Sequence, residues 1–199
     1  MLAIKNQPKT SLFSGLFSVV AATLIAGGLY LLSLVSAPII MPLVSKPLDP
    51  TALASPQFGE NRIIIPKIAV DIPYKQGEAA LNTGAWWRYP ERGNPSQGGN
   101  FILAAHRFEM QLTPQATWEK SPFYRIDKLT VGDEIIIDYN GKRYGYKIDS
   151  ISNVKPTQTE IEAPSDKPKL TLYSCGLGGA KVDRHAITAE PLGEVVIKN

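Results

Sequence analysis

Residues 134–148 read EIIIDYNGKRYGYKI, and this stretch decides the class of fold. Its centre, Asn140-Gly141, suits a tight turn in which both central residues need positive φ. After the turn, Tyr144, Tyr146 and Ile148 alternate with polar or small residues, which is the pattern of a strand with one buried face. The stretch therefore predicts a β-hairpin.

Short apolar runs of the same kind occur on both sides of this hairpin. They are NRIIIP (61–66), KIAVDIP (67–73), NFILAAH (100–106), KLTLYSC (169–175), HAITAE (185–190) and EVVIKN (194–199). Connections rich in Gly and Pro, such as RYPERGNPSQGG (88–99), separate them. Beyond residue 58 we expect helical turns only around 77–87 and 121–126. The pattern predicts an all-β barrel or sandwich.

The N-terminal segment is apolar over a long distance. No charged residue occurs from Thr10 to Ser45, which is enough to cross a bilayer as one helix. Lys5 and Lys9 precede it, so the positive-inside rule places the N-terminus in the cytoplasm and the rest outside. A cleaved signal peptide is the competing interpretation, because residues 35–37 read Val-Ser-Ala. The run is longer than a signal peptide needs and Pro38 would follow the cut, so a retained anchor is favoured.

Three parts of the chain follow from this pattern. Residues 1–37 form a cytoplasmic tip and transmembrane anchor. Residues 38–57 form a Pro-rich linker that we expect to be extended, since proline fixes φ and lacks an N–H. Residues 58–199 form the β domain.

Charge and composition exclude some functions. The formal net charge is +3, and Lys5, Lys9, Lys46 and Asp49 account for +2 of it. The β domain is therefore nearly neutral, which argues against nucleic-acid binding. Acidic residues such as Asp149 and Asp183 lack the spacing of metal ligands, and the chain has no Cys/His cluster for zinc, so we expect neither a metal nor a cofactor.

Cys175 is the only cysteine, and it lies at the end of the run KLTLYSC, just before a Gly-rich segment. Most free cysteines are small buried apolar residues. A spare thiol outside the cytosol is exposed to oxidation, however, so its presence there indicates a role for the sulfur. The residues alone leave both interpretations open.

A cysteine nucleophile needs a base or a cation close by. The chain offers two histidines: His106 ends the run NFILAAH, and His185 begins HAITAE. His106 is favoured as the partner of Cys175, because both residues end a predicted strand. Arg184 follows Cys175 after one short connection, and a guanidinium there could stabilise the oxyanion of an acyl-transfer intermediate.

Together these residues resemble the sortase family of membrane-anchored cysteine transpeptidases. TLYSC (171–175) resembles the family's Thr-Leu-x-Thr-Cys signature, AAHR (104–107) the segment of the family histidine, and Arg184 the family arginine. The likeness covers about residues 60 to 197. Ser174 departs from the family pattern, which has Thr before the cysteine.

The resemblance implies a closed eight-stranded β-barrel of the sortase type with short helices, after one N-terminal transmembrane helix. It implies that Cys175, His106 and Arg184 are catalytic, with Ser174 and Thr171 as substrate-binding residues. The implied substrates are proteins with a Leu-Pro-x-Thr-Gly-like sorting signal. The acceptor would be an amine of a peptidoglycan precursor or of a pilin.

Two other classes of protein were weighed. An L,D-transpeptidase would have an Arg almost directly after a His-Gly-Cys run, and a papain-like enzyme a Cys near the start of a helix; neither pattern occurs around Cys175. A non-catalytic anchored β-barrel with an inert Cys175 stays an alternative. The reactivity of the thiol towards alkylation distinguishes it.

Overall fold

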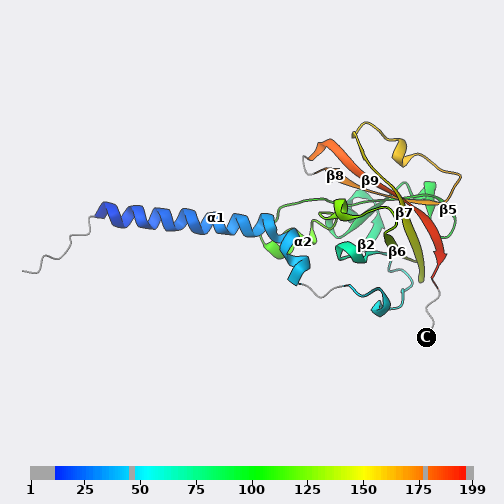
Figure 1. Cartoon of the computed structure of the whole chain (residues 1–199), viewed down its shortest axis with the longest axis horizontal. Coiled ribbons are helices and arrows are strands. Elements are labelled where there is room, and N and C mark those ends of the chain that lie inside the picture. Colours follow the sequence, from blue (N-terminus) through cyan, green and yellow to red (C-terminus); the bar gives the residue numbers. More distant parts are fainter. Residues whose placement is uncertain (1–11, 45–47, 177–178, 196–199) are drawn as a thin grey trace, which may run out of the picture.

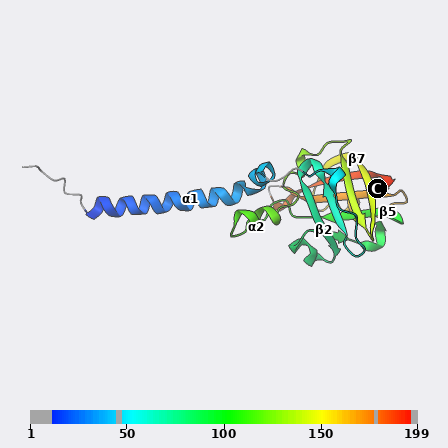
Figure 2. The same ribbon diagram turned by 90° about the horizontal axis from the view of Figure 1, so that it is seen from below.

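A long helix projects from a β-barrel domain (Figure 1; Figure 2). The computed structural model describes residues 12–44, 48–176 and 179–195. The helix, α1 (Leu12–Val44), is long and apolar enough to cross a membrane, and its candidate span runs from Ser14 to Val44. Only its C-terminal part lies against the barrel domain, next to α2 (Pro114–Glu119) in both views.

The helix continues past two prolines, which differs from the extended segment expected from residue 38. Pro38 and Pro42 lie inside α1. Each proline leaves one helical carbonyl without its N–H partner. Leu34, one turn before Pro38, and Ala37, directly before it, are only 3% exposed because this part of α1 packs on the domain. We attribute the continuation to that packing, which local propensity does not include.

Nine strands form the domain, and the barrel closes where β3 pairs with β5. The strand order is β3-β2-β1-β6-β7-β9-β8-β5-β4, and the two-residue β4 stands outside the ring, so eight strands close the barrel. This confirms the expected fold. The strands are β1 (Arg62–Ile65), β2 (Val70–Gln76), β3 (Ala85–Arg88), β4 (Gly93–Asn94), β5 (Gly98–Ala104), β6 (Glu134–Tyr139), β7 (Lys142–Val154), β8 (Lys169–Gly176) and β9 (Gly179–Glu194).

The predicted hairpin is the β6–β7 pair. Asn140 and Gly141 both have positive φ, of 49° and 74°. This is the geometry that a two-residue turn requires to match the twist of its strands. In the register that follows, Ile137 lies opposite Tyr144 and Ile135 opposite Tyr146, and all four side chains are buried.

Short helices fill the connections, partly where they were expected. They are η1 (Pro50–Ala52), η2 (Pro66–Ile68), η3 (Glu78–Asn82), η4 (Pro90–Arg92), η5 (Ile126–Lys128) and η6 (Glu160–Glu162). The turn expected within 77–87 is η3, but that segment ends in the strand β3. The runs 185–190 and 194–199 were expected as two strands. Residues 185–194 instead belong to one strand, β9, and residues 196–199 lie outside the described part.

The barrel interior and the outer surface of β5, β8 and β9 carry different side chains. Leu170, Leu172 and Ile187 point into the main core. The alternate positions belong to a smaller cluster on the outer face, which we call the outer-face cluster: Ile102, Ala104, Tyr173 and Ala186. Because side chains alternate along a strand, this division decides which face each neighbouring residue occupies.

Candidate active site

Cys175 lies on the outer face of β8 and is half-buried. It follows Tyr173 by two residues, so it shares the face of the outer-face cluster. In the antiparallel β8–β9 pair its direct partner is Arg184. Directly opposite residues have neighbouring side chains, so the register brings the thiol and the guanidinium together.

Arg184 has donors that the described residues leave unused. Its Nη1 lies 3.9 Å from Oε1 of Glu162, which is an ion pair but too long for a hydrogen bond. Its guanidinium carbon lies 5.2 Å from the centroid of the Tyr173 ring. Among the described residues no hydrogen bond to the Arg184 side chain occurs, and this side chain is 22% exposed. The guanidinium is held by a charge and a ring while its N–H groups stay available to a ligand.

His106 follows the end of β5, the strand that runs parallel to β8. Ala104 pairs with Tyr173, and the N–H of Ala105 donates to the carbonyl of Tyr173 at 3.3 Å. Continuing this register places His106 level with Cys175. Its Nε2 lies 2.9 Å from Oε2 of Glu109, and a third of the side chain is exposed.

His185 lies on the opposite face from Cys175. It pairs with Ser174 in the β8–β9 register, and both positions continue the inward-facing series of these strands. Its Nδ1 lies 2.9 Å from Oδ1 of Asn153, and its Nε2 is buried with no partner among the described residues. Burial, and then the positive charge of Arg107, lower the pKa of His185 below its ordinary value of 6.5. The structure therefore does not bring His185 to Cys175.

We expect His185 to make the fold sensitive to acid. With its pKa lowered in the folded protein, the unfolded chain binds the proton more readily, so stability is complete above pH 6.5 and falls as the pH drops below that value. The variant His185→Gln should lose less unfolding free energy than the wild type between pH 7 and pH 5. Denaturant titrations at several pH values measure this difference. Equal losses in both proteins would contradict it.

The two expected substrate-binding residues, Ser174 and Thr171, are both buried. Ser174 faces inward, is 1% exposed and donates its hydroxyl to the carbonyl of Cys175 at 3.3 Å. Thr171 is fully buried and donates to Oδ1 of Asn100 at 2.6 Å. The amide of Asn100 in turn donates to the carbonyls of Ile161 and Ala163, in the β7–β8 connection. Both side chains are thus buried and bonded within the protein, and they help to hold β8 and that connection in place.

The structure adds a buried acidic residue that the sequence did not single out. Glu162, in η6, is 3% exposed, and its Oε1 lies 2.7 Å from Nη1 of Arg88. The hydroxyl of Tyr173 donates to the same oxygen. Burial, followed by this bond to Glu162, raises the pKa of Tyr173, so this phenol stays protonated. A buried carboxylate needs such partners, and Glu162 thereby ties the β7–β8 connection to the strand of Cys175.

Glu162 lies in the segment before KLTLYSC, and no motif marks it. Its role depends on Arg88, which is 74 residues earlier in the chain. Among the described residues no group of three or more His, Cys, Asp or Glu could hold a metal ion.

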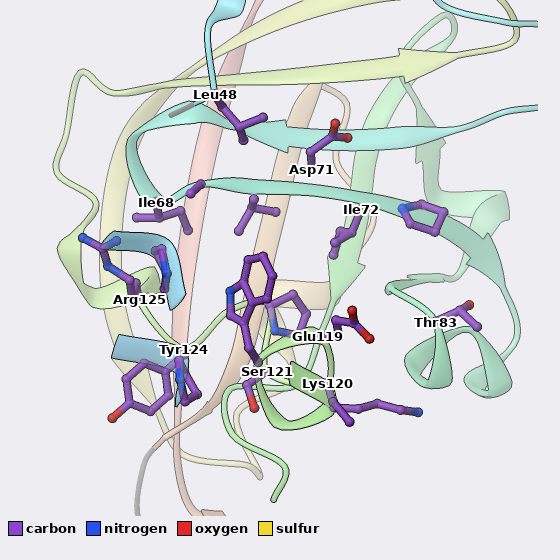
Figure 3. A pocket seen from close by; sticks show the side chains of 18 of the residues that line it. Leu48, Ile68, Asp71, Ile72, Thr83, Glu119, Lys120, Ser121, Tyr124 and Arg125 are labelled. Atoms are coloured by element: carbon purple, nitrogen blue, oxygen red, sulfur yellow. The ribbon is translucent and has the colours of Figure 1, made fainter. Parts of the chain in front are cut away.

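A cavity of about 630 Å³ lies elsewhere, between the end of α1, β2 and the α2 region (Figure 3). Its labelled lining includes Leu48, Ile72, Tyr124 and Arg125. Cys175, His106 and Arg184 do not line it. We therefore separate this cavity from the candidate active site.

Comparison with known proteins agrees with the fold. A family model described as a sortase domain matches residues 63–192. Over 121 residues the chain is 31% identical to sortase SrtE1 of Streptomyces coelicolor; the match covers 56% of this chain and spans 32% of that relative's length.

Two solved structures show the same architecture. The sortase D5 transpeptidase of Clostridium perfringens is 28% identical with a TM-score of 0.54, over 68% of this chain and 79% of that one. Sortase A of Listeria monocytogenes has a TM-score of 0.57 at 18% identity, over 72% and 92%, and shows the fold alone. The family model covers well over half of the chain and includes the strands that carry Cys175 and Arg184. The chain therefore belongs to the sortase family.

Proposed function

We propose that Cys175 is the nucleophile of a two-step transpeptidation on a sorting signal of the Leu-Pro-x-Thr-Gly kind. The sulfur attacks the Thr carbonyl carbon, the bond to the Gly nitrogen breaks, and His106 gives a proton to the departing amine. This leaves a thioester between substrate and enzyme. An incoming amine then attacks the thioester, its proton passes to His106, and the sulfur leaves as a new amide bond forms.

The observation that carries this proposal is the pairing of Cys175 with Arg184 across β8 and β9. A tetrahedral intermediate on the sulfur of Cys175 develops negative charge on the former carbonyl oxygen. Arg184 is the cross-strand partner of Cys175, so its free N–H groups are available to donate to that oxygen. Tyr173 and Glu162 hold the guanidinium in place, so its geometry is set before a substrate binds.

The contact of His106 with Glu109 specifies which nitrogen can act. Because Nε2 is within 2.9 Å of the Glu109 carboxylate, Nδ1 is the nitrogen left to exchange a proton with the substrate. The imidazolium form of His106 is the form that can protonate a leaving amine. Glu109 thus orients His106 for the first half of the reaction.

The apolar helix and the lysines before it support a location for the barrel. We propose that α1 crosses the cell membrane once, with Lys5 and Lys9 on the cytoplasmic side and the barrel outside. There the barrel meets secreted proteins with a C-terminal sorting signal. The acceptor is an amine of a peptidoglycan precursor or of a pilin, and the chemistry needs no cofactor.

A direct test uses the detergent-solubilised full chain with Leu-Pro-x-Thr-Gly peptides and hydroxylamine. Mass spectrometry should find cleavage after Thr and a hydroxamate product. No product but rapid alkylation of Cys175 would keep the active thiol and reject this signal. No product with a protected thiol would favour the non-catalytic barrel.

Replacing Arg184 by Lys should lower kcat/KM on the order of 10²-fold, because an ammonium cannot reproduce the planar set of donors. The steady-state rate of peptide cleavage measures this. Arg62→Lys is the matched control, since Arg62 pairs with Asp71 on β1 and β2 and should change the rate little. An active Arg184→Lys variant would leave Arg184 without the proposed role.

A further inference from the structure

The loop that leaves the active site has its apolar side chains outward and its polar ones inward. Residues 105–113 join β5 to α2. Phe108, Met110 and Leu112 are 37%, 53% and 84% exposed. Arg107, between them and the barrel, is buried, while Glu109 and Gln111 are partly buried, so within 107–112 the even-numbered residues are the exposed ones. An ordinary solvent-exposed loop would expose its polar side chains and bury its apolar ones.

The inward polar side chains keep the loop in this orientation. Arg107 pairs with Asp127 at 3.1 Å and Glu109 with His106 at 2.9 Å, while the Gln111 amide donates to Glu109 at 3.0 Å. The backbone is held too: the N–H of Glu109 donates to Oγ of Ser121, and that of Gln111 to Oγ1 of Thr117. These ion pairs and hydrogen bonds hold the loop in place, so the exposed apolar side chains keep a defined position.

The same loop touches the candidate membrane span. The hydroxyl of Tyr30 donates to the carbonyl of Leu112 at 2.5 Å. Counted from Ser14, where the candidate span begins, a ~30 Å hydrocarbon core at ~1.5 Å per residue ends about 20 residues on, near Leu34, which is already buried against the domain. Tyr30 lies one turn before that point. It is thus near the level at which α1 leaves the bilayer, where Tyr is favoured. Both views place the C-terminal part of α1 beside α2, into which the loop leads (Figure 1; Figure 2).

We propose that Phe108, Met110 and Leu112 insert into the outer leaflet of the membrane and form a second contact of the enzyme with lipid. We call these three residues the loop patch. The inference rests on the part of the proposed function that makes α1 a membrane anchor. The occupant is the lipid surface, because the loop patch lies at the depth where the span meets the headgroups and large apolar side chains there gain from leaving water.

Two properties follow for the enzyme. No lysine or arginine belongs to the loop patch, so the contact should not require anionic lipid. Since His106 begins the loop, insertion sets the height and tilt of the active site above the membrane. Substrates anchored in the same bilayer would then meet Cys175 at a defined distance from the lipid.

The test uses the full chain in phosphatidylcholine vesicles. Cys175→Ala removes the only cysteine, so a Cys introduced at Met110 can carry a polarity-sensitive fluorophore. The matched control carries the probe at Leu192, an exposed leucine near the end of β9. The C-terminal end of that strand lies on the side of the domain away from α1 (Figure 1). We expect blue-shifted emission and quenching by nitroxide lipids at position 110 and neither at 192. Equal emission without quenching at both positions would overturn the proposal.

A second variant separates lipid contact from mere proximity to the anchor. Leu112→Asp, added to the probe at position 110, should reduce the quenching to the level of the control, because a carboxylate in the apolar layer is costly. Quenching that survives this change would mean that the probe is close to lipid only because the anchor is near. A blue shift without quenching would mean that protein rather than lipid covers the loop patch. Either result would overturn the inference.

The hydroxamate assay with the wild-type chain in the same vesicles keeps the two proposals apart. Quenching without hydroxamate would reject the proposed reaction and keep the membrane contact. Hydroxamate without quenching would reject the membrane contact of the loop patch and keep the proposed reaction.

Discussion

Cys175→Ala should abolish the hydroxamate product, with a fall in rate of about 10⁴-fold or more, as expected when a covalent nucleophile is removed. The reason is chemical: in the proposed mechanism Arg184 and His106 assist the sulfur, but neither can form the thioester in its place. Mass spectrometry of the wild-type enzyme with peptide and no acceptor should show the added acyl group on Cys175. The variant should show none.

The fold should survive this substitution. Cys175 is half-buried on the outer face, outside the main core, so losing its sulfur should change the free energy of unfolding by only about 1 kcal/mol. Thermal unfolding of both proteins is the control. Turnover that persists in a folded Cys175→Ala variant would exclude the thioester mechanism.

The second large effect concerns the choice between the two histidines. His106→Ala should lower kcat/KM by about 10²- to 10⁴-fold, the usual contribution of a general acid–base. His185→Ala should leave catalysis nearly intact, because His185 faces inward and bonds to Asn153. Cleavage rates of the two variants with the same peptide measure the contrast.

The two histidine variants also control for each other. If His185→Ala lost more activity than His106→Ala while both stayed folded, the register argument that pairs His106 with Cys175 would be wrong. Glu109→Gln refines the result, since it keeps the shape beside Nε2 of His106 and removes the charge.

Features that depend on neighbouring residues could be predicted from the sequence. The positive φ of Asn140 and Gly141 and the alternation after them follow from local sterics, so the hairpin was predictable. The long uncharged run likewise predicted a span-length helix. The strand β3 was missed because Ala85–Arg88 forms a strand only between two partners, β2 and β5, that lie apart from it in sequence.

The candidate site divides in the same way. The sequence determined the class of fold, the candidate nucleophile and, through family resemblance, the partners Cys175, His106 and Arg184. Only the tertiary structure decided that Cys175 and Arg184 share a face while Ser174 and His185 share the other. It alone also buried Glu162 against Arg88 and continued α1 past Pro38. The physical reason is range: turn geometry and side-chain alternation act within a few residues, whereas register, buried charge pairs and packing against a helix depend on contacts between distant segments.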